Sequence, residues 1–193
     1  MSLVHFIIPS LGRSSLKRTL ISLKQQTIPD WTAQVIYDGV LPTSVYFEEE
    51  KRIRHLFIDK QDGGAGAVRN IGLDKLYGKW TAFVDDDDYL SNKYIERIKY
   101  WGEKGYNLIQ FTYRDVENGN TQPPDNLNHL VECNFGISFA VDTAFIQEHN
   151  IRFTKGGVED YRFLKDCLDK GANYVITHEK IYFVGHRSAW GER

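Results

Sequence analysis

The stretch GGAGAVRNIGLDKLYGKWTAFVDDDDYL, residues 63–90, decides how the rest of the chain is organised. A glycine-rich turn leads into a helical pattern that carries Arg69 and Asn70, and an apolar strand follows over residues 79–84. That strand ends in four consecutive carboxylates, Asp85–Asp88, which repel one another and gain nothing for folding alone. Because a magnesium-like ion prefers carboxylate oxygens together with substrate phosphates, the pattern predicts a metal and a phosphorylated ligand at this strand end.

The composition is that of a globular protein of one domain. The chain has 193 residues, of which 41% are apolar and 26% charged, as expected for a soluble fold. A net charge of −2 gives no electrostatic reason to expect nucleic acid or an anionic membrane surface as a partner. No apolar run approaches the roughly 18 residues of a membrane-spanning helix, so no integral membrane segment is expected.

The cysteines and the N-terminal sequence lead to an expectation about the compartment. Cys133 and Cys167 lack the spacing of a metal-binding finger, so we expect two buried free thiols. No basic segment precedes the first apolar run, so we expect no signal peptide. A cytoplasmic location follows as the expectation.

Strands and helices alternate through the first half of the chain. Apolar strands are expected over residues 4–8, 33–37, 53–58, 79–84 and 107–113. Helical patterns are expected over residues 16–26 and 65–77, the second ended by Gly78, and again from residue 94. Such alternation implies a mainly parallel sheet with helices on both faces.

The second half is less regular. Residues 114–129 are rich in Asn, Gly and Pro and predict a long surface loop. The expected elements that follow are a strand over 135–141, a helix over 143–149, a helix beginning at Glu159, and short strands over 174–177 and 181–184.

Acidic residues follow two of the expected parallel strands. Asp38 comes after the second strand, and Asp85–Asp88 come after the fourth. In an open sheet of this type, ligands bind outside the carboxyl ends of the strands. The sequence therefore predicts a nucleotide at this edge of the sheet.

These segments together resemble the family 2 glycosyltransferases of the GT-A fold. The segments FIIPSLGRSSLKRTLISLKQQTIPDW, VIYDG and GGVEDYRFLKDCLDKG resemble family motifs in the same order, and residues 63–90 resemble the family's central motif almost position by position. Tyr37 and Val68 depart from the family, which often has Asp and Ala there. The resemblance implies a Rossmann-like three-layer α/β/α sandwich with a mainly parallel central sheet. It would form a single domain over residues 1–193, with a nucleotide-sugar-binding part in about 1–113 and an acceptor and catalytic part in about 114–193.

The resemblance implies a metal and donor site at the acidic turn. Asp87 would bind a divalent ion, Mn²⁺ or Mg²⁺, that bridges the two phosphates of the donor. Asp85 would contact the donor ribose or help bind the ion, and Asp86 and Asp88 would orient these two acids or remain in solvent. Apart from the resemblance, the imidazole of His186 is a candidate third metal ligand or, with Arg187, a contact for the leaving diphosphate. The alternative for the carboxylates is an acidic turn without a ligand.

Four further positions are candidates for the nucleotide-sugar site. By the same resemblance, Asp38 would accept a hydrogen bond from N3 of uracil; alternatively, it belongs to an ordinary Asp-Gly turn. The guanidinium groups of Arg69 and Arg13 would pair with phosphate or would neutralise the nearby carboxylates. Pro9 is expected to be structural and to shape the exit of the first strand at this site.

Asp160, with Glu159, resembles the catalytic base of the family. Sugar transfer with inversion needs a carboxylate that removes the proton of the acceptor hydroxyl as its oxygen attacks the anomeric carbon. The alternative is a structural role, because acidic residues in the first turn of a helix interact favourably with its dipole. Two acids after a Gly-Gly turn suit either role.

The expected function is transfer of a sugar from a nucleotide-diphosphate donor, a UDP-sugar, to a hydroxyl of a glycan or another acceptor. The expected mechanism is a metal-dependent single displacement with inversion. A nucleotidyltransferase with a metal-held nucleoside triphosphate is the first alternative, although SLGRSS is a poor match to its basic glycine-rich loop. The second alternative is a degenerate family member that binds a nucleotide or glycan without turnover.

Overall fold

The computed structural model describes residues 1–41 and 50–185 of the chain. Its strands are β1 (Ser2–Ser10), β2 (Trp31–Asp38), β3 (Ile53–Ile58), β4 (Gly78–Phe83), β5 (Tyr89–Leu90), β6 (Leu108–Asp115), β7 (Thr121–Gln122), β8 (Phe139–Asp142) and β9 (Tyr174–Val184). Its helices are α1 (Leu16–Lys24), α2 (Gly64–Leu73), α3 (Tyr94–Glu103), α4 (Thr143–His149) and α5 (Glu159–Asp169).

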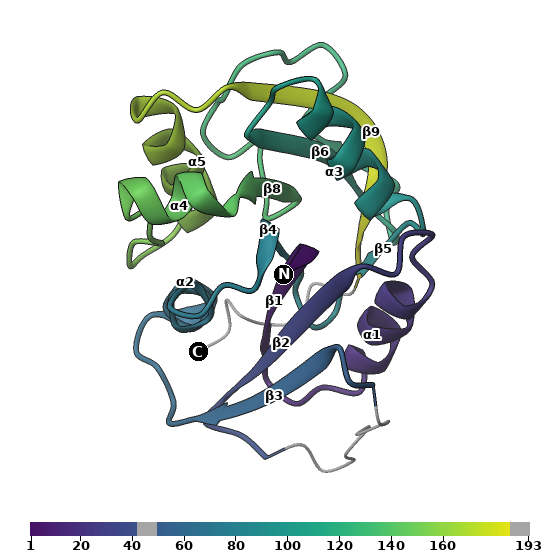
Figure 1. The fold of residues 1–193 in the computed structure, drawn as a ribbon, viewed down its shortest axis with the longest axis vertical. Coiled ribbons are helices and arrows are strands. Elements are labelled where there is room, and N and C mark those ends of the chain that lie inside the picture. Colours follow the sequence, from purple (N-terminus) through teal and green to yellow (C-terminus); the bar gives the residue numbers. More distant parts are fainter. Residues whose placement is uncertain (42–49, 186–193) are drawn as a thin grey trace.

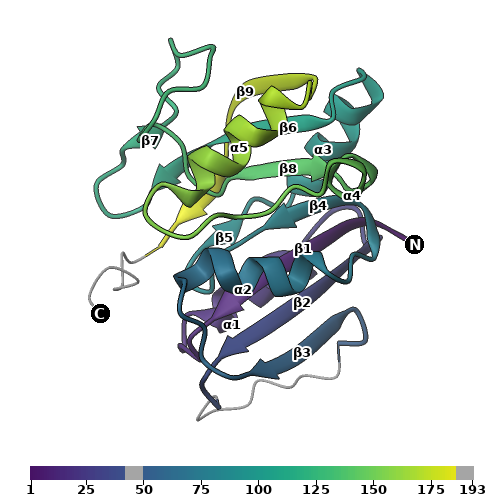
Figure 2. The same ribbon diagram turned by 90° about the vertical axis from the view of Figure 1, so that its left-hand side faces the viewer.

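The strands form one curled sheet in the order β3-β2-β1-β4-β8-β6-β9-β5, with β7 paired to β6 (Figures 1 and 2). The pairs among β3, β2, β1 and β4 are parallel, as is the pair β6–β9. Strand β8 is antiparallel to both of its neighbours, and β5 and β7 are antiparallel additions. The predicted mainly parallel sheet is therefore confirmed, and strands from both halves of the chain belong to it.

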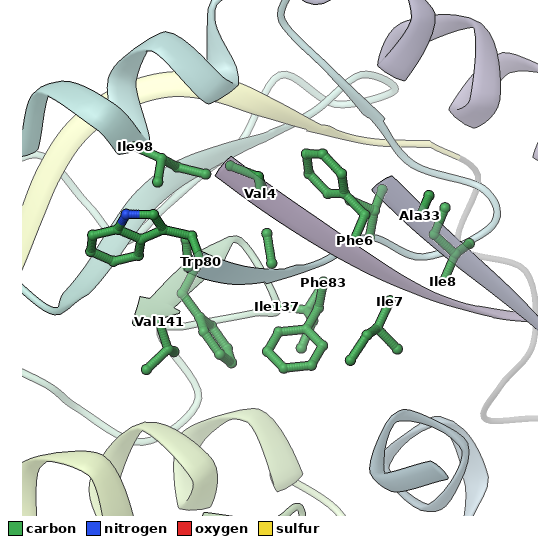
Figure 3. Close-up of a cluster of buried hydrophobic side chains, with 14 of the residues drawn as sticks. Val4, Phe6, Ile7, Ile8, Ala33, Trp80, Phe83, Ile98, Ile137 and Val141 are labelled. Atoms are coloured by element: carbon green, nitrogen blue, oxygen red, sulfur yellow. The ribbon is translucent and has the colours of Figure 1, made fainter. Parts of the chain in front are cut away.

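Helices cover both faces of the sheet, as predicted. Figure 1 shows α2, α4 and α5 on one face and α1 and α3 on the other. Strand β1 is buried on both faces. The ring centroid of Phe6 lies 6.2 Å from that of Tyr94 in α3, whereas the side chain of Ile7 lies against Gly72 of α2. Figure 3 shows these side chains leaving β1 in opposite directions. A strand buried on both faces is mostly apolar along its length, and this explains why residues 4–8 are all buried and, apart from His5, all apolar.

Several boundaries differ from the predicted ones. β3 and α4 have the predicted bounds, but β8 begins only at Phe139 and α2 already ends at Leu73. The two short strands expected near the end are a single strand, β9. The polar residues in its middle are accommodated by a shift in register against β6 and by His178, whose φ is 54°. An irregularity of this kind bends a strand without ending it.

The structure also bears on the expectations about the two cysteines and about membrane-spanning helices. Cys167 is buried as expected, but Cys133 is exposed, so the expectation of two buried thiols is wrong. None of the helices in the described ranges is both long and apolar enough to cross a membrane.

Gly78 is the first residue of β4 rather than the end of a helix. It pairs with Ser2 of β1, and a Cβ atom at this position would lie 2.5 Å from the main-chain nitrogen of His5. Because the obstacle is backbone, it cannot rotate away. The glycine therefore allows the central strands β1 and β4 to approach each other at their amino ends.

We expect Gly78→Ala to destabilise the fold by roughly 1–3 kcal/mol, the usual cost of overpacking. The measurement is chemical denaturation followed by circular dichroism. Gly157→Ala is the matched control, because no heavy atom lies within 4 Å of a Cβ built there. Equal stability of the two variants would show that the close approach at Gly78 does not constrain the sheet.

Candidate active site

A buried arginine joins three carboxylates at the carboxyl edge of the sheet. Arg69 on α2 donates from Nη2 to Oδ1 of Asp85 at 2.6 Å, and from Nη1 to Oε1 of Glu159 and Oδ1 of Asp160, both at 3.4 Å. Asp85 follows β4, and the other two acids open α5. One guanidinium thus brings together four of the residues singled out in the sequence.

Burial and charge act in opposite directions on this arginine. The side chain of Arg69 is only 2% exposed, and burial by itself lowers its pKa. The charges of Asp85, Asp160 and Glu159 outweigh this effect, so that the pKa lies above its ordinary value and the guanidinium stays charged. From the sequence, Arg69 could bind either phosphate or carboxylates, and the structure shows the carboxylate pairs.

Asp160 lies in a different electrostatic environment from an ordinary acid at a helix start. Burial raises its pKa to about 7; Arg69 opposes this rise, whereas the charges of Glu159 and Asp85 add to it. Its side chain is 22% exposed, so the carboxylate still reaches solvent. A carboxyl group with a raised pKa is a better proton acceptor near neutral pH than an ordinary aspartate.

The four consecutive acids divide into two groups. Asp86, Asp87 and Asp88 are all buried as residues, but the side chain of Asp87 keeps 11% of its surface exposed and that of Asp85 is 23% exposed. Both oxygens of Asp86 are used inside the protein: Oδ2 accepts from Ser10 Oγ at 2.8 Å and from the amide of residue 11 at 2.9 Å, and Oδ1 accepts from the guanidinium of Arg13 at 3.2 Å. Asp86 therefore fixes the turn to the end of β1.

Asp88 fixes the same turn to the end of β9. Its Oδ2 accepts from the hydroxyl of Tyr182 at 2.7 Å, and its Oδ1 accepts from the amide of Gly185 at 3.0 Å. Burial, followed by the charge of Asp85, raises the pKa of Asp88 well above its ordinary value. Ser10 and Tyr182 were not among the predicted site residues, because nothing in their local sequence indicates a contact with the acidic turn.

Arg13 has a second partner in the acidic turn. Its Nη1 also lies 3.2 Å from Oδ2 of Asp87, while the main-chain oxygen of Asp87 accepts from Arg18. As with Arg69, the structure shows Arg13 paired with carboxylates. Basic side chains thus lie against each of the two partly exposed acids.

Asp38 lies at the carboxyl end of β2, on the same edge of the sheet. Its Oδ1 accepts from the amide of Gln61 at 2.7 Å, and the side chain is buried. Burial raises the pKa of the preceding Tyr37 to about 12, and the charge of Asp86 in the acidic turn adds to this rise. Pro9 lies inside β1 opposite Ile36, so that the strand continues past it to Ser10 instead of ending there.

The acidic turn offers few ligands for a metal. In the described residues, no group of three His, Cys, Asp or Glu side chains could bind an ion together. Asp85 and Asp87 are the two partly exposed carboxylates, and two carboxylates with substrate phosphates are what a magnesium-like ion requires. The residues present therefore fit an ion that arrives with a diphosphate. His186, the third predicted ligand, lies outside the described residues.

Comparison with known proteins gives a family and a fold. The family described as "Glycosyl transferase family 2" matches residues 6–162. An uncharacterized glycosyltransferase of Haemophilus influenzae is 24% identical over 200 residues, which cover 95% of this chain and 79% of that protein. The poly(ribitol-phosphate) beta-N-acetylglucosaminyltransferase TarP of Staphylococcus aureus is 24% identical over 205 residues, covering 95% and 63%.

The fold has solved counterparts. The structure of S. aureus TarS 1-349 in complex with UDP-GlcNAc superposes with a TM-score of 0.82 at 18% sequence identity, covering 97% of this chain and 59% of that chain. The present chain thus spans less than two thirds of the TarS and TarP chains. It belongs to glycosyl transferase family 2, as its motifs predicted, and it is a glycosyltransferase domain with the GT-A fold.

We expect Arg69→Met to cost at most about 3–5 kcal/mol at pH 8, because it leaves three neighbouring, half-buried carboxylates without their cation. Burial already raises the pKa of Asp160 to about 7, and loss of the opposing charge of Arg69 raises it further above its unfolded value. Relative to the wild type, the variant therefore loses stability as pH rises toward this raised pKa, and the loss is smaller at pH 5 than at pH 8. Denaturant titrations at both pH values measure the difference.

Arg152→Met is the control for this comparison. Arg152 also pairs with a carboxylate, Asp74 at 3.5 Å, but on the surface. It should cost little at either pH. If Arg69→Met cost the same free energy at pH 5 and pH 8, the arginine would not be stabilising ionised carboxylates.

Proposed function

We propose that this domain transfers a sugar from a UDP-sugar to a hydroxyl group of a glycan or another acceptor. The observation that carries the proposal is the Arg69 cluster, in which Asp85 of the acidic turn and Glu159-Asp160 of α5 meet at one guanidinium. A donor-side acid thereby lies beside a candidate base. The complex of TarS with UDP-GlcNAc supports a UDP-sugar as the class of donor.

The donor would lie along the carboxyl edge of β2, β1 and β4. Asp38 would accept a hydrogen bond from N3 of uracil, and Pro9 would shape the strand exit beside it. Asp85 would contact the ribose, with Asp86 fixing the turn behind it and Arg13 near the phosphates. A nucleotide bound here would run from the end of β2 toward the Arg69 cluster.

A divalent ion, Mn²⁺ or Mg²⁺, would be bound by Asp87 and Asp85, with His186 as a further candidate ligand. When bound, such an ion offsets the negative charge that grows on the leaving diphosphate. The two carboxylates need a partner charge in the absence of the ion as well, and Arg69 and Arg13 supply it. These arginines also limit the repulsion between the acids and the phosphates of the donor.

Asp160 would act as the general base in a single displacement with inversion. The acceptor oxygen forms a bond to the anomeric carbon while the bond from that carbon to the diphosphate oxygen breaks. The proton of the acceptor hydroxyl passes to Asp160, and the electron pair of the broken bond leaves with UDP. Burial raises the pKa of Asp160 and so favours the protonated carboxyl group that this transfer produces. The charge of Arg69 lowers the pKa and so favours the ionised carboxylate that accepts the proton.

We expect UDP to bind in a metal-dependent manner, because the carboxylates of Asp85 and Asp87 alone repel its phosphates. In calorimetric titrations, Mn²⁺ should strengthen UDP affinity, and Asp87→Asn should weaken it at least about tenfold in the presence of Mn²⁺. Asp169→Asn, a change of an exposed acid at the far end of α5, should leave the affinity unchanged. The proposed ion site is wrong if Mn²⁺ does not alter the affinity of the wild-type protein.

We expect Asp160→Asn to lower the rate of transfer by about 10²- to 10⁴-fold, the usual cost of removing a general base. A panel of UDP-sugars, including UDP-GlcNAc, identifies the donor through release of UDP with water as the acceptor. UDP affinity and melting temperature should stay close to wild type, because Asp85 and Glu159 remain to neutralise Arg69.

Glu159→Gln is the matched variant for this experiment. Loss of activity in Glu159→Gln alone would assign the base to Glu159. Full activity in both variants would reject α5 as the source of the base. Failure of the wild-type protein to release UDP from any donor, although it binds UDP, would favour a degenerate nucleotide-binding protein.

A further inference from the structure

Asn70 binds the main chain of a distant segment through both ends of its side-chain amide. Its Nδ2 donates to the carbonyl oxygen of Phe153 at 2.9 Å, and the amide of Phe153 donates to its Oδ1 at 2.8 Å. The side chain thus satisfies the donor and the acceptor of one residue, as a neighbouring β-strand would. Two hydrogen bonds in fixed directions determine both the position and the orientation of that segment relative to α2.

Phe153 in turn contacts the helix that carries the candidate base. Its ring stacks on Phe163 of α5 with centroids 4.3 Å apart, and it meets Phe83 of β4 edge-on at 5.1 Å. The guanidinium of Arg69 lies 5.3 Å from the centre of the same ring. The residue bound by Asn70 is therefore in contact with the sheet, with α5 and with the central arginine.

Helix α2 also approaches this segment closely. A Cβ atom at Gly66 would lie 3.2 Å from Cβ of Phe153 and 3.3 Å from Cγ of Glu159. Both distances are tighter than ordinary van der Waals contact, so the glycine is what allows α2 to lie this close to Phe153 and Glu159. The position of Phe153 relative to α2 therefore bears directly on the position of Glu159 at the start of α5.

The turn that links Phe153 to α5 is weakly anchored by its own contacts. Residues 154–157 are exposed, and Val158 has a left-handed φ of 59°, which is unusual for a β-branched residue. A hydrogen bond of 3.0 Å from the side chain of Arg162 to the carbonyl oxygen of Lys155 joins this turn to α5 and not to the rest of the fold. Such a backbone conformation persists only when the surrounding structure imposes it.

We propose that Asn70 is a positioning residue for the reaction: by clamping the main chain of Phe153 to α2, it holds the first turn of α5 so that Asp160 stays beside Arg69 and Asp85. This inference rests on the proposed function, in which Asp160 is the base. Asn70 itself makes its contacts with backbone and does not take part in the chemistry. The hydrogen bonds that Asp86 accepts from Ser10 of β1 and that Asp88 accepts from Tyr182 of β9 involve neither Asn70 nor Phe153, so donor binding should survive loss of the clamp.

Two substitutions separate hydrogen bonding from packing. Asn70→Ala removes the amide and leaves a space, whereas Asn70→Leu fills nearly the same volume and makes no hydrogen bond. The matched control is Asn173→Ala, because Asn173 also donates from its side-chain amide to a distant carbonyl oxygen, that of Gly105 at 2.9 Å, but lies beyond the C-terminal end of α5, at the opposite end from Glu159 and Asp160.

In both Asn70 variants, kcat for release of UDP from UDP-GlcNAc should fall on the order of 10²-fold, as for a small misplacement of a catalytic group. The KM for the donor and the calorimetric affinity for UDP with Mn²⁺ should not change. Hydrogen–deuterium exchange should become faster in peptides that cover residues 151–165 and stay as in wild type in β1 and β4. Asn173→Ala should match wild type in every measurement.

Three results would overturn the proposal: unchanged exchange in residues 151–165, recovery of wild-type behaviour in Asn70→Leu, or loss of UDP binding together with the whole fold. The first would show that the clamp is dispensable. The second would reduce Asn70 to a space-filling residue, and the third would make it a general requirement of the fold. The exchange measurement needs no turnover, so it decides the clamp even if the wild-type protein transfers no sugar.

Discussion

The charge balance around Arg69 is the interaction on which the site depends. A guanidinium excluded from water is unfavourable unless carboxylates surround it, and carboxylates this close to one another are unfavourable without a cation. Asp85, Glu159 and Asp160 come from a strand end and from a helix start more than seventy residues away along the chain. The attraction between Arg69 and these acids brings the donor side and the acceptor side of the proposed reaction to one point.

The run of four acids is best understood as two pairs with different tasks. Asp86 and Asp88 point inward and attach the turn to the ends of β1 and β9. Asp85 and Asp87 keep part of their surface in solvent. A short turn that is attached at two points cannot move far, so the carboxylates of Asp85 and Asp87 are held in fixed positions.

The sequence allowed prediction of the order of elements, the mainly parallel sheet and the meeting of acids at one edge, because apolar periodicity and strand-end chemistry are local signals. It did not indicate that β9 is continuous across His178, since that depends on pairing with β6. It likewise gave no sign of the contacts of Tyr182 or Asn70. Those contacts join residues more than eighty positions apart, and no pattern within a short window records them.

The hydrogen bond from Tyr182 to Asp88 limits how far the protein can fold while it is still being synthesised. The acidic turn is made early in the chain, but the hydroxyl that satisfies its buried carboxylate comes from a residue 94 positions later. Until β9 has been synthesised, Asp88 lacks this hydrogen bond. The acidic turn therefore reaches its final form only after the C-terminal strand has joined the sheet, and exchange of C-terminal segments between relatives must preserve this tyrosine or an equivalent donor.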